Sequence, residues 1–374
     1  MLNMPIMEDD IRENGFLSED EAKRFAEEEE DGALNAIPPT DIIAFTEQRS
    51  CADIYRMYKK GQLEIQPDFQ RGDVWSLRSQ TLFIDSLIKQ LPIPSLCISL
   101  DVSSQRRLVI DGLQRIRTII KFLDDTPGKE YGLSQTKAVD SRLSGKKVSQ
   151  IRKDNPELCE ILENVTIPIT ILRCDYSKKA HMQYLYQIFY RLNTGGNKLY
   201  NQEIRNCIFQ GTFNTFLKSY VRDEQWLRLY GVTEKDINKA RFRYEEQLLR
   251  FFAFYNNLDN YNGSLASFLN DYMEDNMNSS DAAIEEFTNL ISRTIQVASK
   301  IVDLSTSINI REAVFVGIAK NLDRLETQEG RLIDVKYRRM LMEKEFSTEE
   351  MQEGLSSKDK VKNRINCAIR VLGE

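Results

Sequence analysis

The segment Asp111-Gly112-Leu113-Gln114-Arg115 has the residue types of a phosphate-binding turn. It follows an apolar run and precedes an amphipathic segment, so we predict a strand that becomes a helix at Gly112. The first N–H groups of a helix lack acceptors within it, and the helix dipole favours an anion there. Gly112 allows close approach, Gln114 offers amide donors, and Arg115 supplies a guanidinium for phosphate. An ordinary turn, with Asp111 as the helix cap and Arg115 as a surface charge, is the alternative.

Two further strings place polar and aromatic residues beside expected helix ends. Residues 67–75 read Pro-Asp-Phe-Gln-Arg-Gly-Asp-Val-Trp and precede a helix that Ser76 is expected to cap. Residues 191–196 read Arg-Leu-Asn-Thr-Gly-Gly and end a helix at two glycines. Taken singly, each string is also explained by a packed turn or a helix end.

Histidine occurs once, as His181, which excludes an HNH nuclease, a His-rich zinc site or an HD-type phosphohydrolase built from these residues. We expect this lone residue to be a packing residue, with a general base as the alternative. The six cysteines include no Cys-x-x-Cys pair, which predicts reduced, buried thiols. We therefore expect no metal site of His or Cys ligands.

The charge is unevenly distributed over the 374 residues, whose net charge is −6. Residues 1–31 hold 12 acidic and 3 basic residues, a net of −9, and the remainder has 48 basic against 45 acidic residues, a net of +3. We expect residues 1–40 to be an acidic, disordered leader; a tail that covers a basic surface is the alternative. No basic region followed by an apolar stretch opens the chain, so we expect a cytoplasmic protein.

The apolar spacing predicts an α+β fold, with a small mixed sheet and helices in residues 41–210 and a mainly helical domain in residues 211–374. Two β-rich runs joined by Asp-Val-Ser-Ser-Gln at 101–105 predict a hairpin. Strands are expected at 41–48, 63–65, 95–100, 107–110 and 165–172, and helices at 50–58, 77–91, 113–123 and from Ser177 onward. The later helices are expected at about 201–220, 235–256, 281–302, 311–325, 331–345 and 358–372, with phenylalanines as their core.

Residues 124–156 are polar, and we expect them to form a loop-rich basic insertion. The stretch 137–153 has six basic residues and one acidic residue, a net of +5. Such a stretch is a candidate footprint on nucleic-acid phosphates, and a solvated loop is the alternative. The candidate DNA-binding residues are Lys146, Lys147, Arg152 and Lys153.

Taken in order, these strings resemble the N-terminal domain of GmrSD-type restriction systems (domain of unknown function 262), a family similar in fold to ParB and sulfiredoxin. The resemblance spans roughly residues 45–210. It is carried by residues 67–71 with Val74-Trp75, by 86–87 and 91–94, by 110–115, and by 192–196 with Gln202-Glu203-Ile204-Arg205.

The resemblance implies binding and hydrolysis of a nucleoside triphosphate. For such phosphoryl transfer, the carboxylates of Asp68, Asp73 and Asp111 are available to hold Mg²⁺. The candidate catalytic residues are Arg115, Gln114 and Asp111. The candidate nucleotide-binding residues are Gln70, Arg71, Gly112, Gln114, Arg115 and Asn193. Leu113 stands where many members carry Gln, which removes one amide donor. It also stands where a sulfiredoxin-like reductase would need Cys. The P-loop string is absent from the sequence.

Family members that cut DNA carry an HNH nuclease domain after the first domain, and these residues hold no second histidine to build one. The resemblance therefore implies an NTP-hydrolysing, DNA-stimulated module of a bacterial anti-phage restriction system, with no HNH nuclease of its own. The expected partners are a nucleotide, DNA and a separate nuclease chain, with no membrane; a homodimer is left open. The alternative function is a non-catalytic DNA-binding or partner-binding protein whose nucleotide pocket is structural or vestigial.

Overall fold

The computed structural model describes residues 38–65, 75–192, 199–305, 307–352 and 354–374. These residues fall into two compact units, divided between Leu199 and Tyr200. The first unit holds the sheet and the second is helical, as the α+β prediction requires. The predicted acidic leader lies almost wholly outside the described residues.

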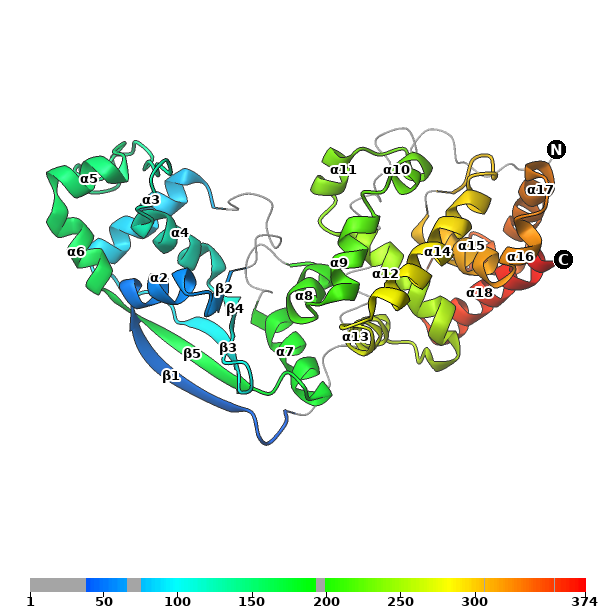
Figure 1. Ribbon diagram of the computed structural model, residues 1–374, viewed down its shortest axis with the longest axis horizontal. Coiled ribbons are helices and arrows are strands. Elements are labelled where there is room, and N and C mark those ends of the chain that lie inside the picture. Colours follow the sequence, from blue (N-terminus) through cyan, green and yellow to red (C-terminus); the bar gives the residue numbers. More distant parts are fainter. Residues whose placement is uncertain (1–37, 66–74, 193–198, 306, 353) are drawn as a thin grey trace. The chain divides into compact units, whose positions relative to one another are not determined.

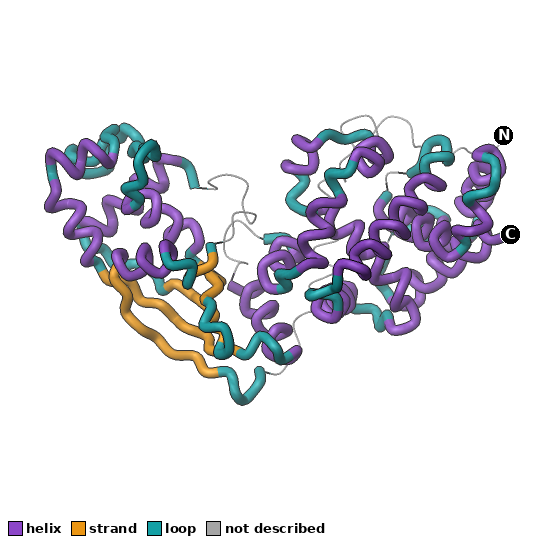
Figure 2. The backbone as a smooth tube through the Cα atoms, viewed as in Figure 1, coloured by secondary structure: helices purple, strands orange, loops and turns teal. Residues whose placement is uncertain are grey.

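The sheet unit contains a five-stranded mixed sheet of order β1-β5-β3-β4-β2 (Figures 1 and 2). β3 runs parallel to β5 and antiparallel to β4, which confirms the predicted hairpin. In chain order the elements are β1 (Ile43–Ser50), α2 (Cys51–Lys59), β2 (Leu63–Glu64), α3 (Leu77–Ile88), β3 (Leu96–Asp101), β4 (Arg107–Asp111), α4 (Leu113–Leu123), α5 (Val148–Asp154), α6 (Pro156–Asn164), β5 (Thr166–Cys174) and α7 (Lys179–Leu192).

Side-chain caps set where the first helices begin. Ser50 accepts a hydrogen bond from the Asp53 N–H at 3.0 Å, and Ser76 accepts one from the Ser79 N–H at 3.1 Å. Each hydroxyl satisfies a donor that has no acceptor inside its own helix. Ser76 was predicted as a cap and Ser50 as the start of a helix, and the structure confirms both helix starts.

The core of the sheet unit lies between one face of the sheet and α2, α3, α4 and α6. Ile98 of β3 and Ile169 of β5 are fully buried there, as are Ile84 of α3 and Ile119 of α4. Figure 1 shows these helices on one side of the sheet. On the other face, α7 packs against β4. The neighbouring residues Val109 and Ile110 of β4 are therefore both buried.

The prediction of a loop-rich segment at residues 124–156 is confirmed for 124–147, which contain no helix or named strand, but the segment is not a separate basic insertion. The segment contains α5 and the start of α6, and it contributes Leu133, Leu143 and Ile151 to the core. These apolar residues are widely spaced among lysines and serines, so the average polarity of the segment concealed them. The segment is an integral part of the sheet unit.

The helical unit confirms the predicted helical character of residues beyond 200. Two of its helices, α10 and α13, were not predicted, and several predicted segments are pairs of shorter helices. No helix in the described parts of the chain is long and apolar enough to cross a membrane. The α-helices are α8 (Asn201–Ile208), α9 (Thr212–Tyr220), α10 (Glu224–Tyr230), α11 (Glu234–Lys239), α12 (Arg243–Asn257), α13 (Leu265–Asp275), α14 (Asp281–Ala298), α15 (Ile308–Lys320), α16 (Leu322–Leu325), α17 (Gly330–Leu341) and α18 (Lys358–Gly373); η3 (Leu258–Asn260) and η4 (Lys344–Phe346) are 3₁₀ turns.

Aromatic side chains form the core between α9, α12 and α14. Phe213 and Phe216 of α9 both contact Phe252 of α12 and Phe287 of α14, with ring centroids 5.3 to 6.2 Å apart. The prediction that the phenylalanines are core residues is confirmed, because Phe213 and Phe252 are fully buried.

A buried ionic cluster lies beside this aromatic core. Arg250 of α12 donates to Glu246 at 2.6 Å and lies 3.8 Å from Glu312 of α15, which also pairs with Arg364 of α18 at 3.5 Å. Burial raises the pKa of Glu312, and the two guanidinium groups oppose this shift. Burial also acts on Glu246, but the charges of Arg250 and Arg205 outweigh it and lower its pKa. The cluster thus joins α12, α15 and α18 through charges that depend on one another.

We expect Arg250→Met to destabilise the helical unit by about 3 kcal/mol, because it removes a cation from between two buried carboxylates. The exposed pair Arg228 with Glu224 provides the control, and Arg228→Met should cost less than about 0.5 kcal/mol. Urea unfolding followed by the fluorescence of buried Trp226, in a Trp75→Phe background, measures both. Equal losses of unfolding free energy for the two variants would show that the ionic cluster around Arg250 contributes no more than an exposed ion pair.

Candidate nucleotide site

The turn between β4 and α4 depends on Gly112. This residue is the N-cap of α4 and adopts the left-handed conformation, with φ of 92°. A Cβ atom there would lie 2.2 Å from Cδ2 of Leu96 and 3.1 Å from Nη2 of Arg115. Glycine is therefore required both by the backbone angle and by the space. It offers no side-chain cap, so the first N–H groups of α4 remain available to an anion.

Arg115 is bonded to the protein on three sides. Its Nη2 donates to Oδ2 of Asp111 at 2.9 Å and to the Ser95 carbonyl at 3.3 Å, and its Nη1 donates to the Pro94 carbonyl. Burial lowers the pKa of the guanidinium, whereas the Asp111 carboxylate favours its charged form. The side chain is only 13% exposed. Arg115 therefore fixes the start of α4 to the segment before β3.

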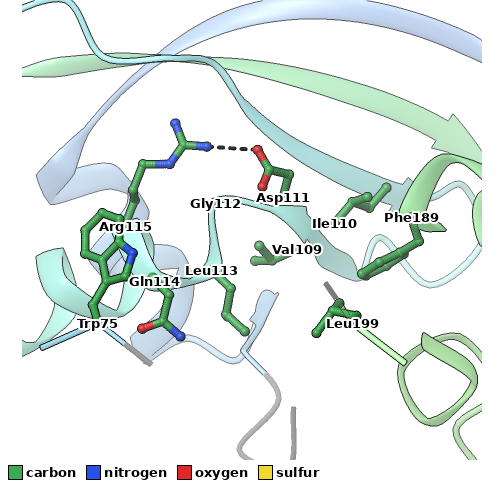
Figure 3. Close-up of a pocket in the computed structure, with 10 residues that line it drawn as sticks. All are labelled: Trp75, Val109, Ile110, Asp111, Gly112, Leu113, Gln114, Arg115, Phe189 and Leu199. Atoms are coloured by element: carbon green, nitrogen blue, oxygen red, sulfur yellow. Dashed lines mark hydrogen bonds and ion pairs between the residues drawn. The ribbon is translucent and has the colours of Figure 1, made fainter. Parts of the chain in front are cut away.

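A cavity of about 170 Å³ lies at this turn. Trp75, the end of β4, the first turn of α4, Phe189 of α7 and Leu199 line it (Figure 3). The volume is below the ~300–1,000 Å³ of pockets that enclose whole ligands. This part of the site is therefore suited to a fragment of a ligand, such as one or two phosphate groups.

Gln114 supplies a buried donor at the cavity. Its Nε2 atom is buried and has no hydrogen-bond partner among the described residues. In Figure 3 its amide points away from the ion pair of Asp111 and Arg115. Leaving a buried amide unpaired costs about 1–3 kcal/mol, so such a group calls for an acceptor from outside.

Trp75 is held in place on the cavity wall by polar and aromatic contacts. Its carbonyl accepts from Nε2 of Gln80 at 2.9 Å, and Oε1 of Gln80 accepts from the Tyr131 hydroxyl at 2.9 Å. Its indole packs edge-on against Phe83 with ring centroids 5.4 Å apart. The half-buried indole therefore offers a fixed apolar surface beside the first turn of α4.

The structure brings Asp111, Gly112, Gln114 and Arg115 together at one cavity, as the sequence predicted. Gln70, Arg71, Asn193 and two candidate Mg²⁺ ligands, Asp68 and Asp73, lie outside the described residues. Within the described part of the chain, Asp111 is the one carboxylate on the cavity wall, and it pairs with Arg115. A Mg²⁺ ion would need further oxygen ligands from the nucleotide or from the segment around Asp68.

His181 does not line this cavity. It is 3% exposed, and its Nδ1 accepts from the Asp175 N–H at 2.9 Å. Its Nε2 lies 2.8 Å from Oδ1 of Asp41. Hydrogen bonds from Lys178 and then from His181 lower the pKa of Asp41 to about 2. Both ring nitrogens are thus occupied in joining the chain before β1 to the chain around α7, which supports a structural role.

The four candidate DNA-binding residues divide into two groups. Lys146, Lys147 and Lys153 are exposed on or beside α5. Nη2 of Arg152 instead donates to the carbonyls of Phe122 and Leu123, at 3.0 and 2.9 Å. Arg152 therefore satisfies carbonyls at the end of α4 that have no donor within the helix.

The string Gln202-Glu203-Ile204-Arg205 has a structural explanation in the helical unit. Glu203 accepts from the Tyr200 N–H at 2.8 Å and from Arg241 at 2.7 Å, and burial raises its pKa against the effect of Arg241. Arg205 donates to Asn270 of α13 at 2.9 Å. These side chains therefore join α8 to neighbouring segments of the helical unit.

Residues 51–210 match the family described as GmrSD restriction endonuclease, N-terminal domain. The match confirms the resemblance over this segment, which is less than half of the chain. Residues 211–374 lie outside it. No curated protein and no solved structure matches the chain. The predicted similarity in fold to ParB and sulfiredoxin therefore stays a prediction.

Three lining residues were missed as site residues. Neither Phe189 nor Leu199 was predicted to line the site. Trp75 was treated as part of a turn. Periodicity shows which side of α7 is buried, but only the packing of α7 against β4 places Phe189 at the cavity.

We expect Gly112→Ala to destabilise the sheet unit by about 1–3 kcal/mol more than Gly61→Ala does. Both glycines have positive φ, 92° and 66°, so both variants bear the left-handed penalty of about 1–2 kcal/mol. Only Gly112 lacks space for a Cβ; nothing lies within 4 Å of a Cβ at Gly61. Hydrogen exchange of the β3 and β4 amides measures the difference, and equal losses would show that the close approach is unimportant.

Proposed function

We propose that the sheet unit binds a nucleoside triphosphate, with its phosphates at the first turn of α4, and hydrolyses it with Mg²⁺ as part of a restriction system. The observation that carries this proposal is the buried Nε2 of Gln114, which has no hydrogen-bond partner in the described part of the chain. The uncapped start of α4 at Gly112 supports it, because helix N-terminal N–H groups favour phosphate oxygens. The match to the GmrSD N-terminal domain supplies the restriction context.

The residues at the cavity would have different roles in this function. Gln114 and the first N–H groups of α4 would bind phosphate oxygens directly, and Trp75 would offer an apolar surface to the rest of the nucleotide. Arg115 would act through the turn, because three of its N–H groups already bind Asp111, Pro94 and Ser95. Phosphoryl transfer depends mainly on such positioning and on charge stabilisation. A separate chain would supply the nuclease.

We expect Gln114→Leu to weaken nucleotide binding about 10-fold to 100-fold without destabilising the fold. The variant removes an Nε2 donor that has no hydrogen-bond partner among the described residues, so stability should stay equal or rise. Calorimetric titration with each nucleoside triphosphate and Mg²⁺, together with phosphate release with and without duplex DNA, measures both binding and hydrolysis. Unchanged affinity, or a loss of affinity that accompanies unfolding, would contradict this role for Gln114.

Gln80→Leu is the matched control for that substitution. Gln80 has the same side chain but uses both ends of its amide, toward the Trp75 carbonyl and the Tyr131 hydroxyl. Its replacement should therefore lower stability, because two polar groups lose their partner. The free energy of unfolding therefore distinguishes Gln80→Leu from Gln114→Leu even if both variants bind nucleotide more weakly.

Duplex DNA binding is a second candidate function, favoured by exposed lysines at α5. Lys146, Lys147 and Lys153 form no ion pair with any described residue. We expect Lys146→Gln/Lys147→Gln to reduce the slope of log affinity against log salt concentration by about 2, since two phosphate contacts are lost. Lys235→Gln/Lys239→Gln on α11 is the control. An unchanged slope in the α5 variant would assign DNA binding to another surface.

A further inference from the structure

β1 forms one edge of the sheet. All eight of its residues pair with β5, from Ile43 opposite Arg173 to Ser50 opposite Thr166. On its other side, no strand of the described residues pairs with it, and Figure 2 shows it as the outermost long strand. Every second N–H and C=O group of an edge strand points away from its neighbour and can pair with another chain.

The two edges of this sheet differ in how they are protected. The opposite edge strand, β2, has two residues, and short edge strands limit pairing with other chains. β1 has eight residues, more than the usual five or six. It contains no proline and no lysine, and its register with β5 is unbroken. β1 therefore lacks the short length, proline, lysine and bulges that commonly limit edge pairing, and its charged residues are Glu47 and Arg49.

The side chains of β1 combine apolar exposure with internal charge balance. Ile43 is 54% exposed and Phe45 is 41% exposed. Glu47 and Arg49 follow on the same face, because side chains alternate along a strand. Arg49 donates to both carboxylate oxygens of Glu47, at 2.8 and 3.1 Å. The strand therefore has no net charge, so a second β1 strand is not repelled by it. Its two charged side chains already pair with each other, so β1 offers no unpaired charge that would attract a charged peptide.

We infer that a second copy of this chain pairs with β1 in antiparallel orientation about a two-fold axis at Thr46. In this register Phe45 lies opposite Glu47 of the second copy, and Ile43 lies opposite Arg49. The aliphatic stems of the charged pair then cover the exposed apolar side chains, and the two Phe45 rings are diagonal neighbours within reach of each other. The two sheets become one continuous sheet.

A Thr46→Cys variant tests this register. Directly opposed residues of an antiparallel pair have Cα atoms about 4.5–5.5 Å apart, which a disulfide spans. All six native cysteines are buried, so the introduced thiol is the exposed one. Under a thiol–disulfide redox buffer, Thr46→Cys should form a disulfide-linked dimer. Gln48→Cys is the matched control: the two copies of position 48 lie four residues apart along the strands, about 13 Å, and should not link.

Sedimentation velocity of the full chain without added cysteines tests the dimer itself. We expect a concentration-dependent dimer whose dissociation constant rises about 10-fold or more in Phe45→Lys, with an unchanged circular dichroism spectrum. A monomer at all concentrations, a dimer unaffected by Phe45→Lys, or equal linking of the two cysteine variants would overturn the inference. None of these measurements involves nucleotide, so they are independent of the proposed function.

Discussion

The close packing of Gly112 against Leu96 is the constraint on which the candidate site depends. Gly112 has no Cβ, and a Cβ there would overlap Leu96. This allows β4 to lie close to β3 and to turn directly into α4. The turn places the N-terminus of α4 beside the end of β4, and it brings Arg115 within reach of the Pro94 and Ser95 carbonyls. The cavity, the ion pair of Asp111 and Arg115, and the N-terminal donors of α4 all lie at this turn.

Local chemistry made much of the fold predictable. Ser50 and Ser76 cap helices where the sequence indicated, and the alternation of apolar residues located the strands within a few residues. The order of the strands was not readable, because β5 lies between β1 and β3, and that pairing joins segments more than sixty residues apart. The helix α5 was missed because its two buried residues, Val148 and Ile151, are separated by polar ones.

At the candidate site, the residue types identified the turn but did not show which partner each side chain binds. Arg115 and Arg152 looked alike in sequence, as cations free to meet phosphate, yet both bind backbone carbonyls. An arginine is free to bind phosphate only if no backbone carbonyl already accepts its N–H groups. The carbonyls near it are known only when segments distant in sequence have been placed. The converse holds for Gln114: only once its neighbours are placed is it visible that no described residue accepts from its Nε2.

Arginine contacts at both ends hold α4 in a fixed position. Arg115 anchors its first turn to the segment before β3, and Arg152 binds the carbonyls of its last two residues. Sliding or fraying of the helix would break charge-assisted hydrogen bonds at one end or the other. The donors at its N-terminus are therefore preorganised, so an incoming anion gains their full electrostatic effect with little loss of conformational entropy.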